Sequence, residues 1–306
     1  MKLKQFILLA ALGLTASATL TSCEDILGHW EKPTPVTPTP SGSEESVPGL
    51  LTGKFTINAS GDKVRFSQGN LQAKIASYAS DAATASEWQF AANQYDYIGN
   101  AAGNNSFAVD SWVDLFSWVG ASADNDTYGL ITFGSATQAN HGNITPESLK
   151  TDWGTAAASN IGSGWRTLTK DEWTYLFNGR TSVTTRYCKA TVNDKSGVVL
   201  FPDSYTHPAD GGTAPASVNT IGAAFTTNTW TAAQWTAMET AGAVFLPAAG
   251  YRSGTSVDVG SYGYYWSSTA YGAGPAYAYF ESSNLSPNSN GLRYYGVSVR
   301  LVRPAE

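Results

Sequence analysis

The chain has 306 residues, a formal net charge of −6, 12% aromatic residues and two cysteines. An acidic balance disfavours nucleic acid as a partner, because recognition of a phosphate backbone needs clustered lysine and arginine. The two cysteines, Cys23 and Cys188, offer no disulfide framework, so we expect a core rich in tryptophan and phenylalanine to hold the fold.

Residues 1–22 predict a secretory signal peptide. Lys2 and Lys4 precede the apolar run FILLAALGL, which is too short to span a bilayer permanently. The next four residues, LTSC, end at Cys23 and resemble the lipobox of bacterial lipoproteins. That resemblance implies that the Cys23 thiol is lipidated, and acyl chains would then be the protein's one attachment to a membrane. An ordinary secreted protein is the alternative.

Residues 23–50 predict a spacer. They are rich in proline, threonine, serine and glutamate, a composition that favours extended chain and cannot bury a core. Glu24 and Asp25, directly after the cysteine, resemble the surface-export signals of Bacteroidetes lipoproteins. That resemblance implies a protein anchored in the outer membrane and facing the cell exterior.

Residues 51–306 are enough for one large domain. Near its start, KFTINAS and KVRFSQGNLQ alternate apolar and polar residues and predict short strands. The segment DSWVDLFSWVG is aromatic and expected to be buried. Residues 120–164 are expected to be loop, apart from one short helix capped by Thr145.

Two helices have clearer signals. In TLTKDEWTYLFNG, Thr169 and Glu172 predict a capping box and Gly179 the end of the helix. In TWTAAQWTAMETAG, Thr231 and Gln234 predict a second capping box. Strands are expected in GVVLFPD, AVFLPAAGYR, AYAYFES and GVSVRLVRP. The order of these elements predicts an α+β fold, with two main helices on a twisted, mostly antiparallel sheet and chain ends that lie close together.

Five segments in chain order carry a longer resemblance: GWRTLTKDEWTYLF, GVVLFPD, AGAVFLPAAGYRSGT, GSYGYYWSST and GVSVRLVRP. They resemble a family of Bacteroidetes surface lipoproteins related to the Fibrobacter-type major paralogous domains. The resemblance implies a C-type-lectin-like fold with long loops over residues 53–304, as in formylglycine-generating enzymes. Those enzymes bind copper through paired cysteines, and Cys188 stands alone here. We therefore expect no oxidase activity, no cofactor and a small buried thiol at Cys188.

Other catalytic and metal signals are weak. His29, His141 and His207 lie in the spacer or in expected loops without metal-ligand spacing, so we expect no metal site. Calcium-dependent sugar-binding motifs of C-type lectins are not present in the sequence. Asp203 and Asp210 flank His207 and could hold a cation, although turn chemistry is favoured.

Two alternatives to a binding protein stay open. A carboxylate pair of a glycan-processing or other surface hydrolase can come from anywhere in a sequence. Asp171 and Glu172 are better explained as charges favoured at a helix N-terminus. The third class is a structural subunit of a surface assembly.

The most unusual segment is tyrosine-rich. Between Tyr262 and Tyr295 lie 8 of the 16 tyrosines, among serine, glycine, alanine and asparagine. Antibody loops use the same set, because tyrosine offers a large rigid surface and the small polar residues adapt their hydrogen bonds. We expect loops at 262–265, 271–279 and 282–295, within a display region at about 258–296, to bind an unknown protein or glycan. The predicted contact residues are Tyr264, Tyr271, Tyr277, Tyr279, Asn284, Asn288, Asn290, Arg293, Tyr294 and Tyr295.

The residue types missing from this segment resemble those missing from the variable proteins of diversity-generating retroelements. Randomised adenines there turn asparagine codons into NNY codons, which never encode lysine, glutamine, glutamate, methionine or tryptophan. Between Tyr264 and Tyr295 the excluded types are Trp266 and Glu281, which would be fixed positions. Trp266 and Phe280 are assigned to the core. Chance composition is the alternative explanation.

Overall fold

The computed structural model describes residues 47–79, 82–118, 131–132, 152–271, 274–293 and 295–306. The described residues belong to one compact unit, Glu45–Glu306. The predicted signal peptide, Cys23, nearly all of the spacer, the helix expected at Thr145 and Tyr294 lie outside the described residues.

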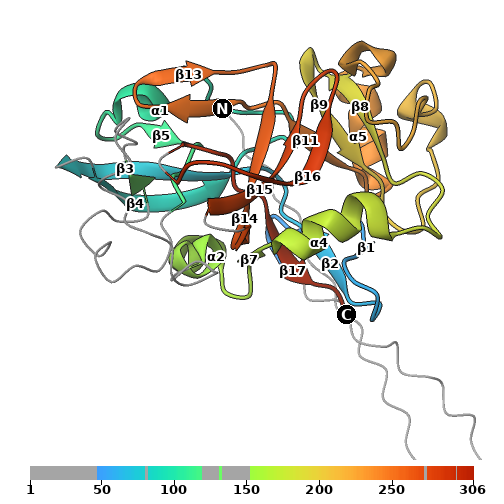
Figure 1. Ribbon diagram of the computed structural model, residues 1–306, viewed down its shortest axis with the longest axis horizontal. Coiled ribbons are helices and arrows are strands. Elements are labelled where there is room, and N and C mark those ends of the chain that lie inside the picture. Colours follow the sequence, from blue (N-terminus) through green and yellow to red (C-terminus); the bar gives the residue numbers. More distant parts are fainter. Residues whose placement is uncertain (1–46, 80–81, 119–130, 133–151, 272–273, 294) are drawn as a thin grey trace, which may run out of the picture. The chain divides into compact units, whose positions relative to one another are not determined.

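The described part has a mixed α+β architecture with more strand than helix (Figure 1). In place of one continuous sheet, its strands form five small sheets. Their pairing is mostly antiparallel, as predicted; the pair of β8 and β10 is parallel. No described helix is long and apolar enough to cross a membrane.

The first sheet joins the two ends of the folded unit. Its order is β1-β2-β17-β7, with β1 Phe55–Thr56, β2 Lys63–Phe66, β17 Leu301–Pro304 and β7 Arg166–Thr167. Lys54 Nζ also donates to the Glu306 backbone carbonyl at 2.8 Å. The expectation that the ends lie close together is therefore confirmed.

The other sheets use mainly sequence neighbours. One has the order β5-β3-β4-β6, with β5 Trp112–Val113, β3 Leu71–Ala79, β4 Ala82–Phe90 and β6 Ile131–Thr132. Another has the order β10-β8-β9-β11, with β10 Thr229–Trp230, β8 Tyr187–Val192, β9 Lys195–Leu200 and β11 Val244–Pro247. A short hairpin pairs β12 Tyr251–Ser253 with β13 Ser256–Asp258. The last is the meander β14-β15-β16, with β14 Gly263–Tyr271, β15 Gly274–Phe280 and β16 Leu285–Asn290.

Both predicted capping boxes are confirmed. Helix α4, Lys170–Thr174, begins after Thr169, and α5, Ala232–Thr240, begins after Thr231. In each helix the threonine hydroxyl accepts a hydrogen bond from the backbone N–H three residues on. The side chain of that third residue, Glu172 or Gln234, accepts one from the backbone N–H of the threonine. Gly242, at φ +93°, ends α5 against the backbone of Gly53, where a side chain would not fit.

Three short α-helices in the described part were not predicted: α1 Ala102–Ser106, α2 Trp153–Ala156 and α3 Ala158–Ile161. The last two correct the expectation of loop before residue 164. Asp152 caps α2 by accepting from the Gly154 N–H at 2.8 Å, and Trp153 is buried in the core. Tertiary burial of one aromatic ring stabilises a turn too short to have its own helical periodicity.

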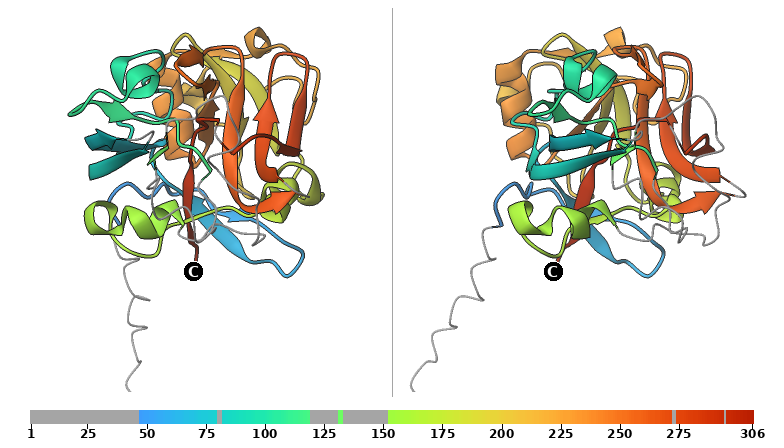
Figure 2. Two further views of the ribbon diagram at one scale, coloured as in Figure 1. Left: turned by 60° about the vertical axis from the view of Figure 1, so that its left-hand side comes forward. Right: turned by 90° about the vertical axis from the view of Figure 1, so that its left-hand side faces the viewer.

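The core is aromatic, as the composition predicts. Eight of the nine tryptophans in the described part are buried. Trp173 of α4 packs in one cluster with the apolar face of the β14-β15-β16 meander, and Trp235 of α5 packs in another with the sheet of β8 and β9. Figures 1 and 2 show α4 running beside the strands of that meander.

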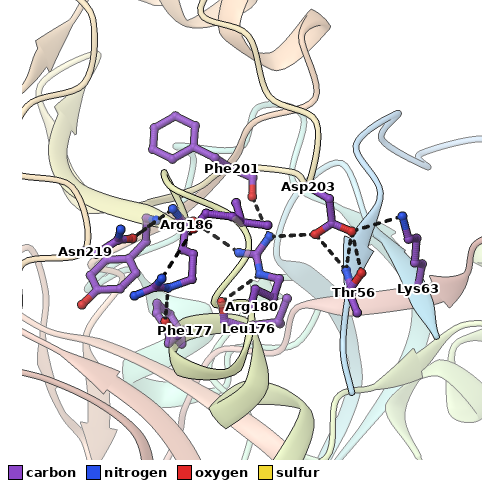
Figure 3. Close-up of polar contacts among 11 residues, drawn as sticks. Thr56, Lys63, Leu176, Phe177, Arg180, Arg186, Phe201, Asp203 and Asn219 are labelled. Carbon is purple, nitrogen blue, oxygen red and sulfur yellow. Dashed lines mark hydrogen bonds and ion pairs between the residues drawn. The ribbon is translucent and has the colours of Figure 1, made fainter. Parts of the chain in front are cut away.

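A polar network fastens the end of the α4 segment, which continues as a π-helical turn over Tyr175–Gly179 (Figure 3). The guanidinium of Arg180 donates to the carbonyls of Leu176 and Phe201 and pairs with Asp203 at 3.3 Å. Burial lowers the pKa of Arg180 to about 10, against the opposing effect of Asp203. Arg180 therefore donates to one carbonyl of the helical turn, that of Leu176, and ties it to the Phe201 carbonyl after β9.

Asp203 joins this network to the first sheet (Figure 3). It accepts from the Thr56 hydroxyl at 2.6 Å and pairs with Lys63 at 3.3 Å. Burial raises the pKa of Asp203, but hydrogen bonds from Thr56 and the charge of Arg180 outweigh it and lower the pKa overall. Asp203 is thus a structural residue, and the expected alternative of a cation site with His207 receives no support from its contacts.

Asp114 is buried at 1% exposure and accepts from the Ile98 N–H and the Asn104 amide at 2.8 and 2.7 Å. Burial raises its pKa to about 6, although these hydrogen bonds oppose the shift. The folded chain therefore binds this proton more tightly than the unfolded chain. As the pH falls through about 6, protonation of Asp114 raises the free energy of unfolding.

We predict that Asp114→Asn removes this contribution. Between pH 7 and pH 5 the wild type should gain about 1 kcal/mol of unfolding free energy relative to the variant. Urea unfolding of both proteins at the two pH values measures the difference. Equal pH dependence of the two proteins would contradict the assignment.

Candidate functional site

Most of the tyrosine-rich segment forms strands: the strand predicted in AYAYFES is present as β15, and much of the expected loops at 262–265, 271–279 and 282–295 is strand as well. β14, β15 and β16 make an antiparallel meander in which Tyr264 pairs with Tyr279, and Tyr279 with Ser286. On the adjacent register, Tyr265 pairs with Ala278. Because successive side chains of a strand point to opposite faces, Tyr264 and Tyr265 lie on different sides of this sheet.

The inner face of the meander is fixed to the core. Tyr265 is fully buried, and its hydroxyl donates to the Pro247 carbonyl at 2.8 Å. The Trp173 indole, also on this side, donates to the Trp266 backbone carbonyl at 3.2 Å. The Trp266 side chain lies on the opposite face with Tyr264, where it packs against Tyr277 in a second core cluster and its indole donates to the Phe116 carbonyl at 2.6 Å. Trp266 and Phe280 are 0% and 1% exposed, which confirms their assignment to the core. These bonds make the sheet a rigid support.

The opposite face carries a tyrosine cluster, which we define as Tyr251, Tyr262, Tyr264, Tyr277, Tyr279 and Tyr295. Tyr264 lies at its centre, 4.9 Å from Tyr279 and 5.2 Å from Tyr277 between ring centroids. Tyr251 joins Tyr264 to Tyr295 at 5.4 and 5.5 Å. Most of these ring pairs are tilted or edge-on, the geometry that aromatic quadrupoles favour.

A depression of about 270 Å³ lies over this face. Six of the ten predicted contact residues line it, together with two serines of β16. The lining consists of Tyr264, Tyr271, Tyr277, Tyr279, Ser286, Asn288, Ser289 and Asn290. All three strands of the meander thus contribute residues to one hollow.

The exposure of these residues varies. Tyr271 is the most accessible tyrosine, at 48%, and Lys170 lies over its ring at 5.7 Å. Tyr264 and Tyr279 are half-buried. Tyr277 is 8% exposed, and its hydroxyl donates to the Asn290 carbonyl at 2.9 Å, so it forms the floor of the depression.

The remaining predicted contact residues lie elsewhere. Asn284 is exposed in the turn between β15 and β16, outside the lining of the depression. Tyr295 is half-buried against Tyr251. Arg293 is only 4% exposed, so its side chain is part of the interior and offers little surface to a ligand. Tyr294 lies outside the described residues.

Four members of this surface were not among the predicted contact residues: Tyr251, Tyr262, Ser286 and Ser289. The last three do lie within the segments expected to bind, 262–265 and 282–295. Tyr262 and Ser286 lie on the outward-facing register of Tyr264 and Tyr279, so strand alternation could have found them. Tyr251 comes from a different hairpin, β12, and reaches the cluster through tertiary packing. Nothing in the local sequence indicates that contact.

The phenols of the depression are neutral donors. Burial raises the pKa of Tyr264, Tyr277 and Tyr279 above the ordinary value of 10, and neighbouring tyrosines add to the shift of each. For Tyr279, a hydrogen bond to Glu281 and the charge of that residue add further. At neutral pH these groups are protonated and can both donate and accept hydrogen bonds.

The groups considered for catalysis have structural contacts. Glu172 closes the capping box and pairs with Arg166 at 2.7 Å. His207 lies between the Tyr205 hydroxyl and the Gly212 carbonyl at 3.0 and 3.1 Å. Cys188 is fully buried in β8, as predicted, and burial raises its pKa. Among described residues, no group of three or more His, Cys, Asp and Glu is placed to hold a metal.

Two other hollows in the described part are charged. One of about 460 Å³ contains the ion pair of Arg166 and Glu172, and one of about 250 Å³ contains that of Arg180 and Asp203. In each hollow, these two charges are engaged with one another. The depression over the tyrosine cluster differs from both because no charged side chain lines it.

Comparisons of the chain with protein-family models, with curated proteins and with solved structures found no match.

The two neighbouring tyrosines of β14 give a matched pair of variants. Tyr265→Phe removes a buried hydrogen bond to Pro247 and should lower the unfolding free energy by about 1–2 kcal/mol. Tyr264→Phe, on the outer face, should change it by less than about 0.5 kcal/mol. Urea unfolding of both variants measures the contrast. A larger loss of unfolding free energy for Tyr264→Phe than for Tyr265→Phe would contradict this assignment of the two faces.

Proposed function

We propose that this protein is a non-enzymatic binding protein that presents the depression over the tyrosine cluster to a ligand. The observation that carries the proposal is the convergence of Tyr, Ser and Asn side chains from three strands around one hollow on a fixed sheet. Rigid tyrosines supply contact area at low entropic cost, and serine and asparagine supply adaptable hydrogen bonds. A few such aromatic anchors dominate the energy of many interfaces.

The finer fold assignment is also a proposal. A C-type-lectin-like domain is consistent with the mixed α+β architecture, with the first sheet that joins both ends of the folded unit, and with the two capped helices. In such a domain the candidate site would belong to the region that follows the second helix.

We propose the cellular setting from the sequence. A lipid on Cys23 and an extended spacer would hold the domain at the outer membrane, and the acidic residues after Cys23 favour the exterior face. The ligand would then be a protein or glycan outside the cell, with the lipid as the sole membrane attachment and no nucleic acid involved.

We further propose that the binding face is a variable region written by a diversity-generating retroelement. The lining of the depression contains only tyrosine, serine and asparagine, all of which NNY codons encode. Trp266, which they cannot encode, is fully buried in the core, as a fixed scaffold residue would be.

Photo-crosslinking on intact cells tests the binding function. A benzoyl-phenylalanine in place of Tyr271 should give discrete adducts with material from neighbouring cells, because that ring is exposed beside the depression. The same substitution at Tyr78, a 39% exposed tyrosine on β3, is the matched control and should give none of them. Unmodified protein should compete the adducts away. Identical adducts at both positions would contradict the proposal.

Sequencing around the gene tests the variability. We expect a near-copy of the 3′ end that differs at adenines, beside a reverse-transcriptase gene. The differing codons should include those of outward-facing residues such as Tyr279 and Asn288 and should spare Trp266. A neighbourhood without such a copy would contradict the retroelement proposal and leave the binding site in place.

A further inference from the structure

The lining of the depression restricts the chemistry of its ligand. Its eight residues are four tyrosines, two serines and two asparagines, and none carries a formal charge. The pKa values of Tyr264, Tyr277 and Tyr279 are raised, so no phenolate forms there near neutral pH. A charged ligand group would lose hydration on entering without finding an opposite charge, which is unfavourable.

The charged residues at the edge are already engaged. Lys170 pairs with Asp171 at 2.6 Å and lies over the Tyr271 ring. Glu281 accepts from the Ser283 hydroxyl at 3.0 Å and interacts with the Tyr279 phenol. Each would have to give up a partner to meet a ligand of opposite charge.

The size and polarity of the depression narrow the class of its ligand further. A hollow of about 270 Å³ suits one small unit, whereas a typical protein–protein interface covers about 800 Å² on each partner. Phenol rings offer apolar surface, and the amides of Asn288 and Asn290 offer donors and acceptors close to it. A sugar ring has the matching pattern, because its C–H faces are apolar and its edges carry hydroxyl groups.

We propose that the depression binds one uncharged saccharide unit of a larger glycan, without a divalent cation. This inference depends on the proposed binding function. The exposed part of Tyr271 would receive the sugar face, while Asn288, Asn290 and the serines of β16 would meet its hydroxyls. Sulfated, phosphorylated and sialylated units would be excluded, because no lining side chain compensates their charge.

The test uses the full-length chain on an array of neutral, sulfated and sialylated oligosaccharides, with and without EDTA. We expect binding to a subset of neutral glycans that EDTA and 0.5 M salt leave unchanged, since neither a metal nor a screened ion pair contributes. Tyr271→Ala should weaken binding at least about tenfold. Tyr271→Phe should keep most of it because the stacking surface remains, and Tyr78→Ala, outside the site, should leave it unchanged.

A second readout separates this inference from the binding function. The crosslinking at position 271 is repeated on cells treated with periodate, which cleaves sugar diols, or with protease. Adducts that are lost after periodate treatment but not after protease treatment support the saccharide ligand. Loss after protease alone, a preference for sulfated or sialylated glycans, an effect of EDTA or an array without bound neutral glycans would overturn it. Adducts at position 271 that survive periodate would still support the proposed binding function. A lack of adducts on untreated cells would contradict both the binding function and the saccharide ligand.

Discussion

Strand alternation is the constraint on which the candidate site depends. Neighbouring residues of β14 point to opposite faces, so Tyr265 must enter the core if Tyr264 faces outward. A slip of one residue would exchange every inner and outer side chain of the strand. The register is therefore held from both faces: the Tyr265 hydroxyl reaches Pro247 on the inner face, and Trp266, on the face of Tyr264, is fully buried with its indole on the Phe116 carbonyl. Beyond Trp266 and Tyr277, the outer face is only partly buried, at Tyr264 and Tyr279, or exposed, at Tyr271.

This division explains how a single meander can be both scaffold and binding surface. Its inner face shares a core with α4, whose position is fixed by the Thr169 capping box and by the network of Arg180 and Asp203. Its outer face carries rings that pack on one another, so each phenol is oriented before a ligand arrives. Preorganisation of this kind reduces the entropy lost on binding.

Local signals made part of this fold predictable. Both capping boxes depend on residues three apart, and the burial of Trp266 and Phe280 follows from their size and polarity. The outward placement of Tyr264 and Tyr279 agrees with strand alternation. Other features of the fold depend on contacts between residues far apart in the sequence. The strand in AYAYFES was predicted, but residues 262–265 and much of 282–295 were expected to be display loops, and pairing across the meander makes most of them sheet. The burial of Arg293 depends in the same way on contacts that its own neighbourhood in the sequence does not reveal.

Hydroxyl-radical footprinting of the native chain measures the two-faced sheet most directly. Mass spectrometry after a brief radical pulse should find rapid oxidation at Tyr271, slower oxidation at Tyr264 and Tyr279, and protection of Tyr265 until urea unfolds the protein. Equal protection of Tyr264, Tyr271 and Tyr265, or oxidation of Tyr265 in the native state, would contradict an outward-facing tyrosine surface and with it the candidate site.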